Sequence, residues 1–213
     1  MASLPPIKAR LVLDLKESDK DIQLKMMASM QTWLNHKFQL AQPTIISRLK
    51  FQVSEWLMAT DEIQSLLGGQ LMADFGIPSP GASVSNIVES VTRTVTVMFK
   101  PLGRTLTGQV LTIAVQPLDF SNVLGIGETI ITKKGAKLDW LEWLLMRGDD
   151  IIVRDYHVEY GSFGRTGEAH MIKPGLFRVD PAFSGTGKDN FITRAFDDKT
   201  DDMIRIIFNA IQS

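Results

Sequence analysis

The sequence predicts an α+β fold with a helical amino-terminal third, a mostly antiparallel β-sheet centre and an amphipathic carboxyl-terminal helix. A short tryptophan-rich helix is expected within the β region. Three observations predict this fold: apolar residues recur at helical spacing in the first third, the period changes to two near residue 90, and helical spacing returns at the end. With 213 residues, 44% of them hydrophobic, the chain can bury a substantial core.

Two helices are expected before residue 60. "IKARLVLDL" follows two prolines and is expected to form a strand or an extended arm. The first helix is predicted from about Asp19, with apolar residues three and four positions apart on one face. Those residues are Ile22, Met26, Met30, Trp33, Leu34 and Phe38. Pro43 is expected to end this helix, and the second carries the stripe Ile45, Leu49, Val53 and Trp56.

A third helix should begin at an N-cap formed by Thr60 or Asp61, although Gly68 and Gly69 weaken its middle. Its apolar residues are Ile63, Leu67, Leu71 and Phe75. Residues 76–86 hold two prolines and two glycines among small polar residues, which predicts a linker or loop. The expected division is therefore 1–78, an arm and helical region, and 79–213, a β-rich region, with one continuous domain as the alternative.

The centre of the chain is expected to consist of strands. Residues 91–99 alternate Val, Arg, Val, Val and Phe with threonines, and residues 108–117 are rich in β-branched side chains, which together predict an antiparallel hairpin. "ETIITKKG" and "DDIIVRDYHVEYG" add strands, and "KLDWLEWLLMRG" between them predicts the short helix, ended by Gly148. The last helix is expected in "DDKTDDMIRIIFNAIQ", with acidic residues at its start and an apolar face. That face comprises Met203, Ile204, Ile207, Phe208 and Ile211.

Composition excludes several classes of function. The net charge is −1, so the chain lacks the basic field that supports nonspecific nucleic-acid binding, and protein partners are favoured. Absence of cysteine excludes a disulfide framework, thiolate catalysis and sulfur-based metal sites, and it fits a reducing cytosol or a particle assembled there. No signal-peptide pattern and no apolar run of about 18 residues occurs, which predicts a soluble, unprocessed chain without a membrane span.

"GSFGRTGEAH", residues 161–170, is the most unusual short stretch in the chain. It lacks the glycine spacing, lysine and following helix of a phosphate-binding loop, so an ordinary glycine-hinged loop is expected. Arg165, beside Thr166, could pair with a carboxylate across a subunit contact, because a guanidinium forms directional hydrogen bonds with carboxylates. A solvated arginine is the alternative.

A metal site is the main chemical alternative. Asp155, His157 and Glu159 would point to one face of an extended segment, with His170 nearby in the sequence. The same pattern is equally typical of a half-exposed strand. No G-x-S-x-G turn occurs for a serine nucleophile. We therefore predict no catalytic residue, and we also predict no metal and no cofactor.

Trp140 and Trp143 are three residues apart, so they lie on neighbouring sides of one helical turn. Core packing explains this pattern. Tryptophan and methionine are also enriched at protein interfaces, and the chain has ten methionines, so a contact surface is the alternative.

Two stretches carry a resemblance to a known group: "SEWLMATDEIQSLLGGQLMADFGIP" (54–78), and residues 138–196 from "LDWLEWLLMRGDD" to "DNFITRAF". They resemble structural proteins of tailed-bacteriophage virions, in the neck and tail group that includes head–tail connector, tail-completion and terminator proteins. The resemblance implies an α+β protomer that forms a homo-oligomeric ring around the DNA channel, assembled in the host cytoplasm and contacting other neck or tail proteins. It also implies no cofactor, no catalysis, and DNA that passes without sequence-specific binding.

Under this resemblance, the glycine-rich loop would settle into shape against a neighbouring subunit, with Arg165 as its anchor and its glycines permitting the backbone turns. The expected interface residues are Gly161, Gly164, Arg165, Thr166, Gly167, Trp140 and Trp143. Two alternatives remain. One is a metal-dependent or hydrolytic enzyme using Asp155, His157, Glu159 and His170, and the other is a monomeric protein-binding adaptor.

Overall fold

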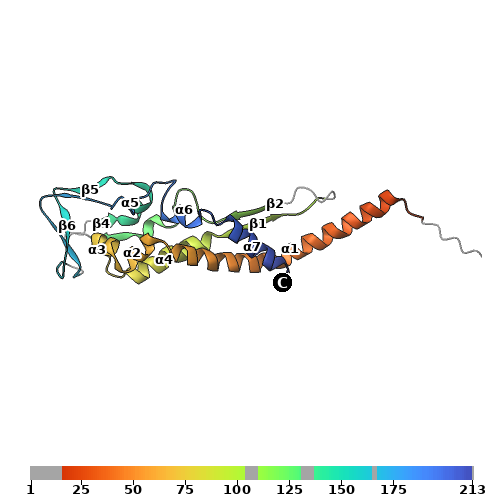
Figure 1. The fold of residues 1–213 in the computed structure, drawn as a ribbon, viewed down its shortest axis with the longest axis horizontal. Helices are drawn as coiled ribbons and strands as arrows, with labels where there is room; N and C mark the ends of the chain where they lie inside the picture. Colours follow the sequence, from red (N-terminus) through yellow and green to blue (C-terminus); the bar gives the residue numbers. More distant parts are fainter. Residues whose placement is uncertain (1–15, 104–109, 131–136, 165–166, 213) are drawn as a thin grey trace, which may run out of the picture. The chain divides into compact units, whose positions relative to one another are not determined.

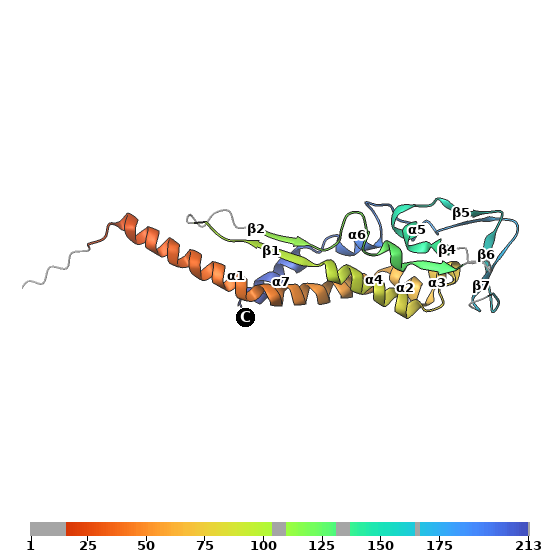
Figure 2. The same cartoon turned by 180° about the vertical axis from the view of Figure 1, so that it is seen from behind.

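The computed structural model describes residues 16–103, 110–130, 137–164 and 167–212, and it confirms the α+β class. Figure 1 shows the ribbon and Figure 2 the same ribbon from behind. The helices are α1 (Asp19–Met58), α2 (Asp61–Gly68), α3 (Gln70–Phe75), α4 (Pro80–Thr94), α5 (Trp140–Met146), α6 (Phe191–Phe196) and α7 (Thr200–Gln212). The strands are β1 (Thr96–Lys100), β2 (Val110–Ala114), β3 (Glu128–Ile130), β4 (Lys137–Asp139), β5 (Ile151–Arg154), β6 (His157–Tyr160), β7 (Ala169–Ile172) and β8 (Leu176–Arg178). A short 3-10 turn, η1, covers Leu124–Ile126.

The chain divides into two compact units. One comprises residues 1–39 and 99–110, and the other comprises residues 40–98 and 111–213. Residues on both sides of the expected boundary at 78 thus belong to the second unit. No described helix is both long enough and apolar enough to cross a membrane.

The prediction that Pro43 ends a helix was wrong, because α1 continues through it. Proline removes one backbone hydrogen bond, and burial of the apolar residues that follow it on α1 offsets this loss. The expected stripe after Pro43 is confirmed. Its four members, Ile45, Leu49, Val53 and Trp56, are all buried in the second unit.

Helices α2 to α4 match the predictions from the sequence only in part. Thr60 is the N-cap of α2, as expected, and its side chain accepts a hydrogen bond from the Ile63 amide. The expected single helix is split at Gly69 into α2 and α3. The linker expected over 76–86 was wrong after residue 79, since Pro80 opens α4, and the strand expected from Val91 begins only at Thr96. Proline suits the first helical turn because its missing N–H would have no partner there.

The first unit packs residues 31–38 of α1 against the end of β1 and the residues just after it. The rings of Phe38 and Phe99 stack with centroids 4.8 Å apart. Asn35 accepts a hydrogen bond from the Leu102 amide at 2.9 Å, and Gln31 donates to the Leu102 carbonyl at 2.7 Å. One side of this part of α1 is therefore occupied within the unit.

The core of the second unit joins helices and strands from distant parts of the chain. Phe75 at the end of α3 stacks on Trp140 of α5 at 5.7 Å and meets Phe177 of β8 edge-on at 6.4 Å. Glu62 is 6% exposed, and Arg194 of α6 donates to its carboxylate at 2.5 Å. These contacts fix α2 and α3 to the carboxyl-terminal half of the chain.

The described strands form four two-stranded sheets with the orders β1-β2, β3-β4, β5-β8 and β6-β7. The last three pairs are antiparallel, as expected. "DDIIVRDYHVEYG" forms two strands, with Asp155 between them at a left-handed φ of 67°. The two strands pair with different partners, β5 with β8 and β6 with β7.

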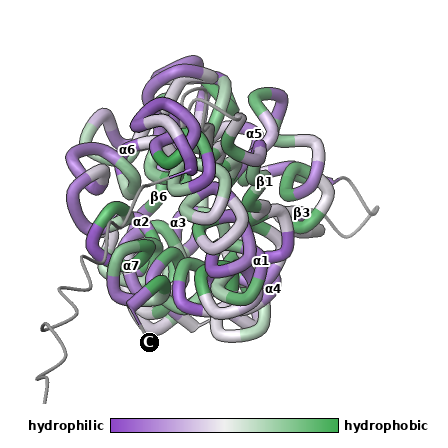
Figure 3. Tube along the Cα trace, turned by 90° about the vertical axis from the view of Figure 1, so that its right-hand side faces the viewer, coloured by the Kyte–Doolittle hydropathy of each residue, from purple (hydrophilic) through white to green (hydrophobic). Residues whose placement is uncertain are grey.

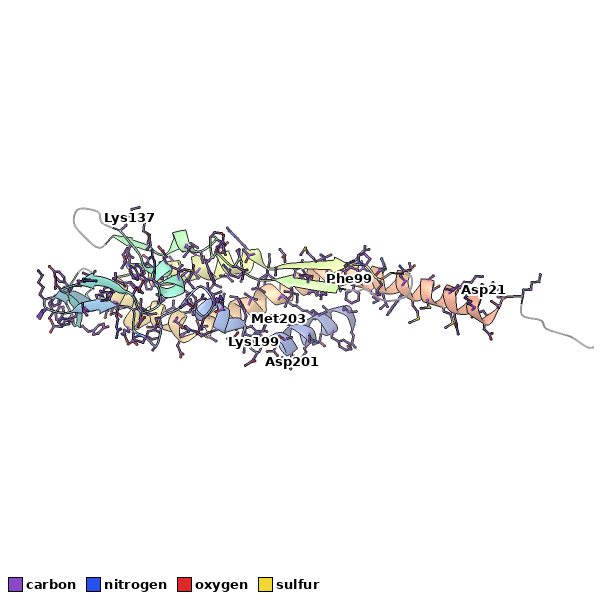
Figure 4. All side chains as sticks on the ribbon, turned by 90° about the horizontal axis from the view of Figure 1, so that it is seen from above. Asp21, Phe99, Lys137, Lys199, Asp201 and Met203 are labelled. Atoms are coloured by element: carbon purple, nitrogen blue, oxygen red, sulfur yellow. The ribbon has the colours of Figure 1, made fainter. Side chains whose placement is uncertain are left out.

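Helix α5 forms within the predicted segment, but it begins only at Trp140 because Lys137–Asp139 form β4. Gly148 after the helix has a φ of 61°, which glycine adopts without strain. Helix α7 begins at Thr200, with Asp201 and Met203 near its start (Figure 4). Colouring by hydropathy shows that polar and apolar residues both occur along helices such as α7 (Figure 3).

Candidate functional site

The glycine-rich stretch connects β6 and β7 in an antiparallel hairpin. Tyr160 pairs with Ala169 in the last register position, and the Gly161 amide donates to the Glu168 carbonyl at 2.9 Å. The segment after the loop is a strand, as the sequence predicted, so no helix amino terminus is available to bind a phosphate. Arg165 and Thr166 lie outside the described residues, so their expected contacts remain predictions.

The loop's own shape requires glycine most clearly at position 164. A Cβ on Gly161 would lie 2.4 Å from the ring of Phe163, an exposed side chain that can turn away. Gly164 has a φ of 82°, and a Cβ there would lie 1.9 Å from the Ala169 carbonyl oxygen. Gly167 also has a positive φ, 78°, but open space around it. The glycines therefore allow a compact turn in which the chain folds back on itself.

The hairpin is attached to the helical part of the second unit through Tyr160. Its hydroxyl donates to Asp74 Oδ1 at 2.5 Å, and Gln70 beside it donates to Asp180 Oδ2 at 3.3 Å. A small cleft lies between the α2–α3 turn and the loop. Its lining includes Gly68, Gln70, Ala73, Tyr160, Ser162 and Glu168.

Burial and hydrogen bonding shift the pKa values of both partners in this contact. Burial raises the pKa of the Asp74 carboxyl, although hydrogen bonds from Tyr160 and Gln70 act in the opposite direction. Burial, together with the bond to Asp74, raises the pKa of the Tyr160 phenol far above its ordinary value. Tyr160 therefore remains protonated and acts as a hydrogen-bond donor that holds the hairpin to α3.

The proposed ligands of the alternative metal site are not arranged for coordination. Asp155 lies in the turn before β6 with a left-handed φ, so the period-two argument does not extend to it. His157 Nδ1 donates to the Pro174 carbonyl at 2.6 Å, and His170 Nε2 lies 3.7 Å from the Glu159 carboxylate. Within the described ranges, no group of three His, Asp or Glu side chains is placed to hold a metal ion.

His170 instead packs within its hairpin. Its ring meets Phe163 edge-on with centroids 4.2 Å apart. Its Nδ1 atom is buried and has no hydrogen-bond partner among the described residues. The histidine and the loop phenylalanine therefore form one small cluster that supports the turn.

The two tryptophans have different environments. Trp140 is 1% exposed and belongs to the core, so a partner could not reach it in the folded chain. Trp143 is half-buried, and the Arg147 guanidinium lies 5.6 Å from the centroid of its ring. Of the pair, only Trp143 remains a candidate for the predicted interface.

Comparison with known protein families, with curated proteins and with solved structures found no match for this chain. The site's main contact, from Tyr160 to Asp74, joins residues 86 positions apart. No local sequence pattern indicates that Tyr160 and Asp74 contact each other, so the sequence did not predict this hydrogen bond.

Proposed function

We propose that this chain is a non-catalytic structural subunit of a tailed-phage virion that assembles in the host cytoplasm as a homo-oligomeric ring at the neck or tail, around the DNA channel. The resemblance of residues 54–78 and 138–196 to neck and tail proteins suggests the group. The observation that carries the proposal is a set of large apolar side chains that are more than half exposed. They include Met26, Trp33, Phe51, Ile204 and Phe208.

Exposed apolar side chains favour association because burying them removes apolar surface from water. Single exposed residues are ordinary, but here they recur on the same helix face, as in the pair Ile204 and Phe208, one turn apart on α7. The net charge of −1 also suits a subunit that surrounds DNA without gripping it.

The test is the native molar mass of the purified chain across a concentration series, measured by light scattering on a sizing column. A ring-sized species, or a monomer that forms rings when mixed with phage neck or tail proteins, would support the proposal. Electron micrographs of that species should show a central channel. A chain that stays monomeric under both conditions would refute ring assembly and favour the monomeric adaptor.

The enzyme alternative has a separate test. A bound divalent metal stabilises only the folded state, so the melting temperature should rise with metal concentration if such a site exists. Under the structural proposal, the melting temperature stays constant across the same metal series.

A further inference from the structure

Helix α1 is shared by the two compact units. Residues 19–39 of the helix belong to the first unit and residues 40–58 to the second. The chain passes between the units at two further points, after Met98 in β1 and after Val110 in β2. One helix and one two-stranded ribbon therefore connect the units covalently.

The hydrogen-bond ladder of α1 is interrupted where the helix passes between the units. Pro43 has no N–H, so the carbonyl of Gln39 lacks the partner that residue 43 supplies in a regular helix. The proline ring also crowds this carbonyl, and proline is one of the few causes of a sharp helix bend. Gln39 is the last residue of α1 in the first unit, so the interrupted turn begins at the boundary.

On each side of the boundary, α1 is bound to β1 within its own unit. In the first unit, the Phe38 ring stacks on the Phe99 ring with centroids 4.8 Å apart. In the second unit, the Gln42 side-chain amide donates to the Val97 carbonyl at 2.9 Å. Between these two contacts lie only residues 39–41 of α1 and Met98 of β1. A bend would therefore be confined to this short segment of each element.

The helix is held firmly on both sides of that segment. Before it, Gln31 and Asn35 both bond to Leu102, in addition to the Phe38 stack. After it, the helix enters the core of the second unit, where Ile45 and Leu49 are each 1% exposed. Bending within either held part would break these contacts, whereas bending at residues 39–43 would keep them.

The β1–β2 ribbon offers little resistance to such a bend. Among the described residues, no third strand pairs with β1 or β2. Two-stranded ribbons twist more than strands within wide sheets, and an isolated hairpin is only marginally stable. The ribbon can therefore follow a bend in α1 without disrupting a larger sheet.

We propose that residues 39–43 of α1 form a hinge about which the first unit swings as one body. The ribbon bends beside it, at residues 98–99 of β1 and 110–111 of β2. Domain hinges consist of a few residues that absorb the change in backbone angles, and their motions take microseconds to milliseconds. The hinge goes beyond the proposed function and does not depend on it. In an assembly, it would let a subunit set its first unit at the angle that a neighbouring protein requires.

The test measures distances between pairs of spin labels by pulsed electron paramagnetic resonance. The chain has no cysteine, so two introduced thiols are the only sites of labelling. Lys20→Cys with Glu55→Cys spans the hinge, and Lys20→Cys with His36→Cys lies within the first unit. All three side chains are exposed, so the fold should be retained, which far-UV circular dichroism checks. Dilution with unlabelled chain suppresses distances between copies.

A straight helix would separate the two pairs by about 52 Å and about 24 Å, at 1.5 Å per residue. Across the hinge, we expect a broad distance distribution with a mean below the straight-helix value. Within the first unit, the distribution should be narrow. Because Pro43→Ala restores the missing N–H, it should narrow the distribution across the hinge and shift its mean toward the straight-helix value.

Ser47→Ala is the matched control. Ser47 is exposed one turn beyond Pro43, and its replacement by alanine also favours helix but leaves the interrupted bond unrepaired. The width across the hinge should therefore stay the same. A distribution across the hinge as narrow as the one within the first unit would overturn the proposal. A broad distribution that Pro43→Ala fails to narrow, or that Ser47→Ala narrows equally, would also overturn it.

Hydrogen exchange provides a second measurement that needs no labels. Amides of residues 40–44 should exchange faster than those of residues 34–38 and 45–49, because opening is easiest at the hinge. Pro43→Ala should remove this local minimum of protection, and uniform protection across 34–49 in the unmodified chain would contradict the hinge. Ring assembly is judged separately by molar mass, so a chain that stays monomeric would leave the hinge standing, and a rigid α1 would leave ring assembly standing.

Discussion

Tyr160→Phe removes only the hydroxyl that attaches the β6–β7 hairpin to α3. The bond to Asp74 is 2.5 Å long, and its acceptor is a carboxyl whose pKa burial raises. Hydrogen bonds to charged groups contribute about 1.5–3 kcal/mol. Because Tyr160 is 52% exposed, water can replace part of this bond. We therefore expect the free energy of unfolding to fall by about 1 kcal/mol, a shift in melting temperature of about 2–4 °C for a chain of this size.

The assay is urea denaturation followed by circular dichroism, together with hydrogen exchange at the Gly161 amide. That amide bonds to the Glu168 carbonyl across the hairpin, so its protection should fall when the hairpin detaches. Tyr156→Phe is the control, because Tyr156 is the only other tyrosine and its hydroxyl makes no hydrogen bond to a described residue. Equal stability and equal exchange in the two variants would show that the Tyr160 bond does not hold the hairpin.

Three further predictions concern the second unit. Because the pKa of Asp74 is raised on folding, the folded state holds its proton to higher pH, and stability should fall as pH rises from about 4 through the raised pKa. Asp74→Asn should remove this fall in pH-dependent melting curves, and an unchanged slope would contradict it. Phe75→Ala should cost about 3–5 kcal/mol in urea denaturation, since its ring stacks on buried Trp140, and a cost below about 1 kcal/mol would contradict this packing. Gly164→Ala should lower the melting temperature because its Cβ would overlap the Ala169 carbonyl, whereas an unchanged value would show that the loop can move aside.

Local sequence rules predicted the fold well where one short segment decides the outcome. The Thr60 cap, the stripe from Ile45 to Trp56 and the short α5 helix each depend on neighbours within one or two turns. The rules failed where packing overrode a local signal. Proline and glycine predicted a linker over residues 76–86, yet the buried residues Val84, Ile87, Val88 and Val91 follow helical spacing and hold α4 against the core. Of these four residues, only Val91 was included in the predicted strand.

The candidate site was predicted less well than the fold. The glycine-rich loop was found from its composition, but its attachment was not, because Tyr160 reaches a residue 86 positions away. Trp140 and Trp143 illustrate the same limit. Both are tryptophans on adjacent sides of one helix, but only tertiary packing decides that Trp140 is buried, where it stacks on the distant Phe75. Sequence periodicity identifies which residues are apolar, and tertiary packing decides which of them are covered.

Helix α1 shows why that distinction matters for function. Its first part is apolar on two sides, so periodicity alone predicts a helix without saying which side faces the core. The side containing Phe38 packs on Phe99, and the side containing Met30 and Trp33 stays exposed. Covering an apolar face removes apolar surface from water, so this second, uncovered face of α1 favours association with a further partner.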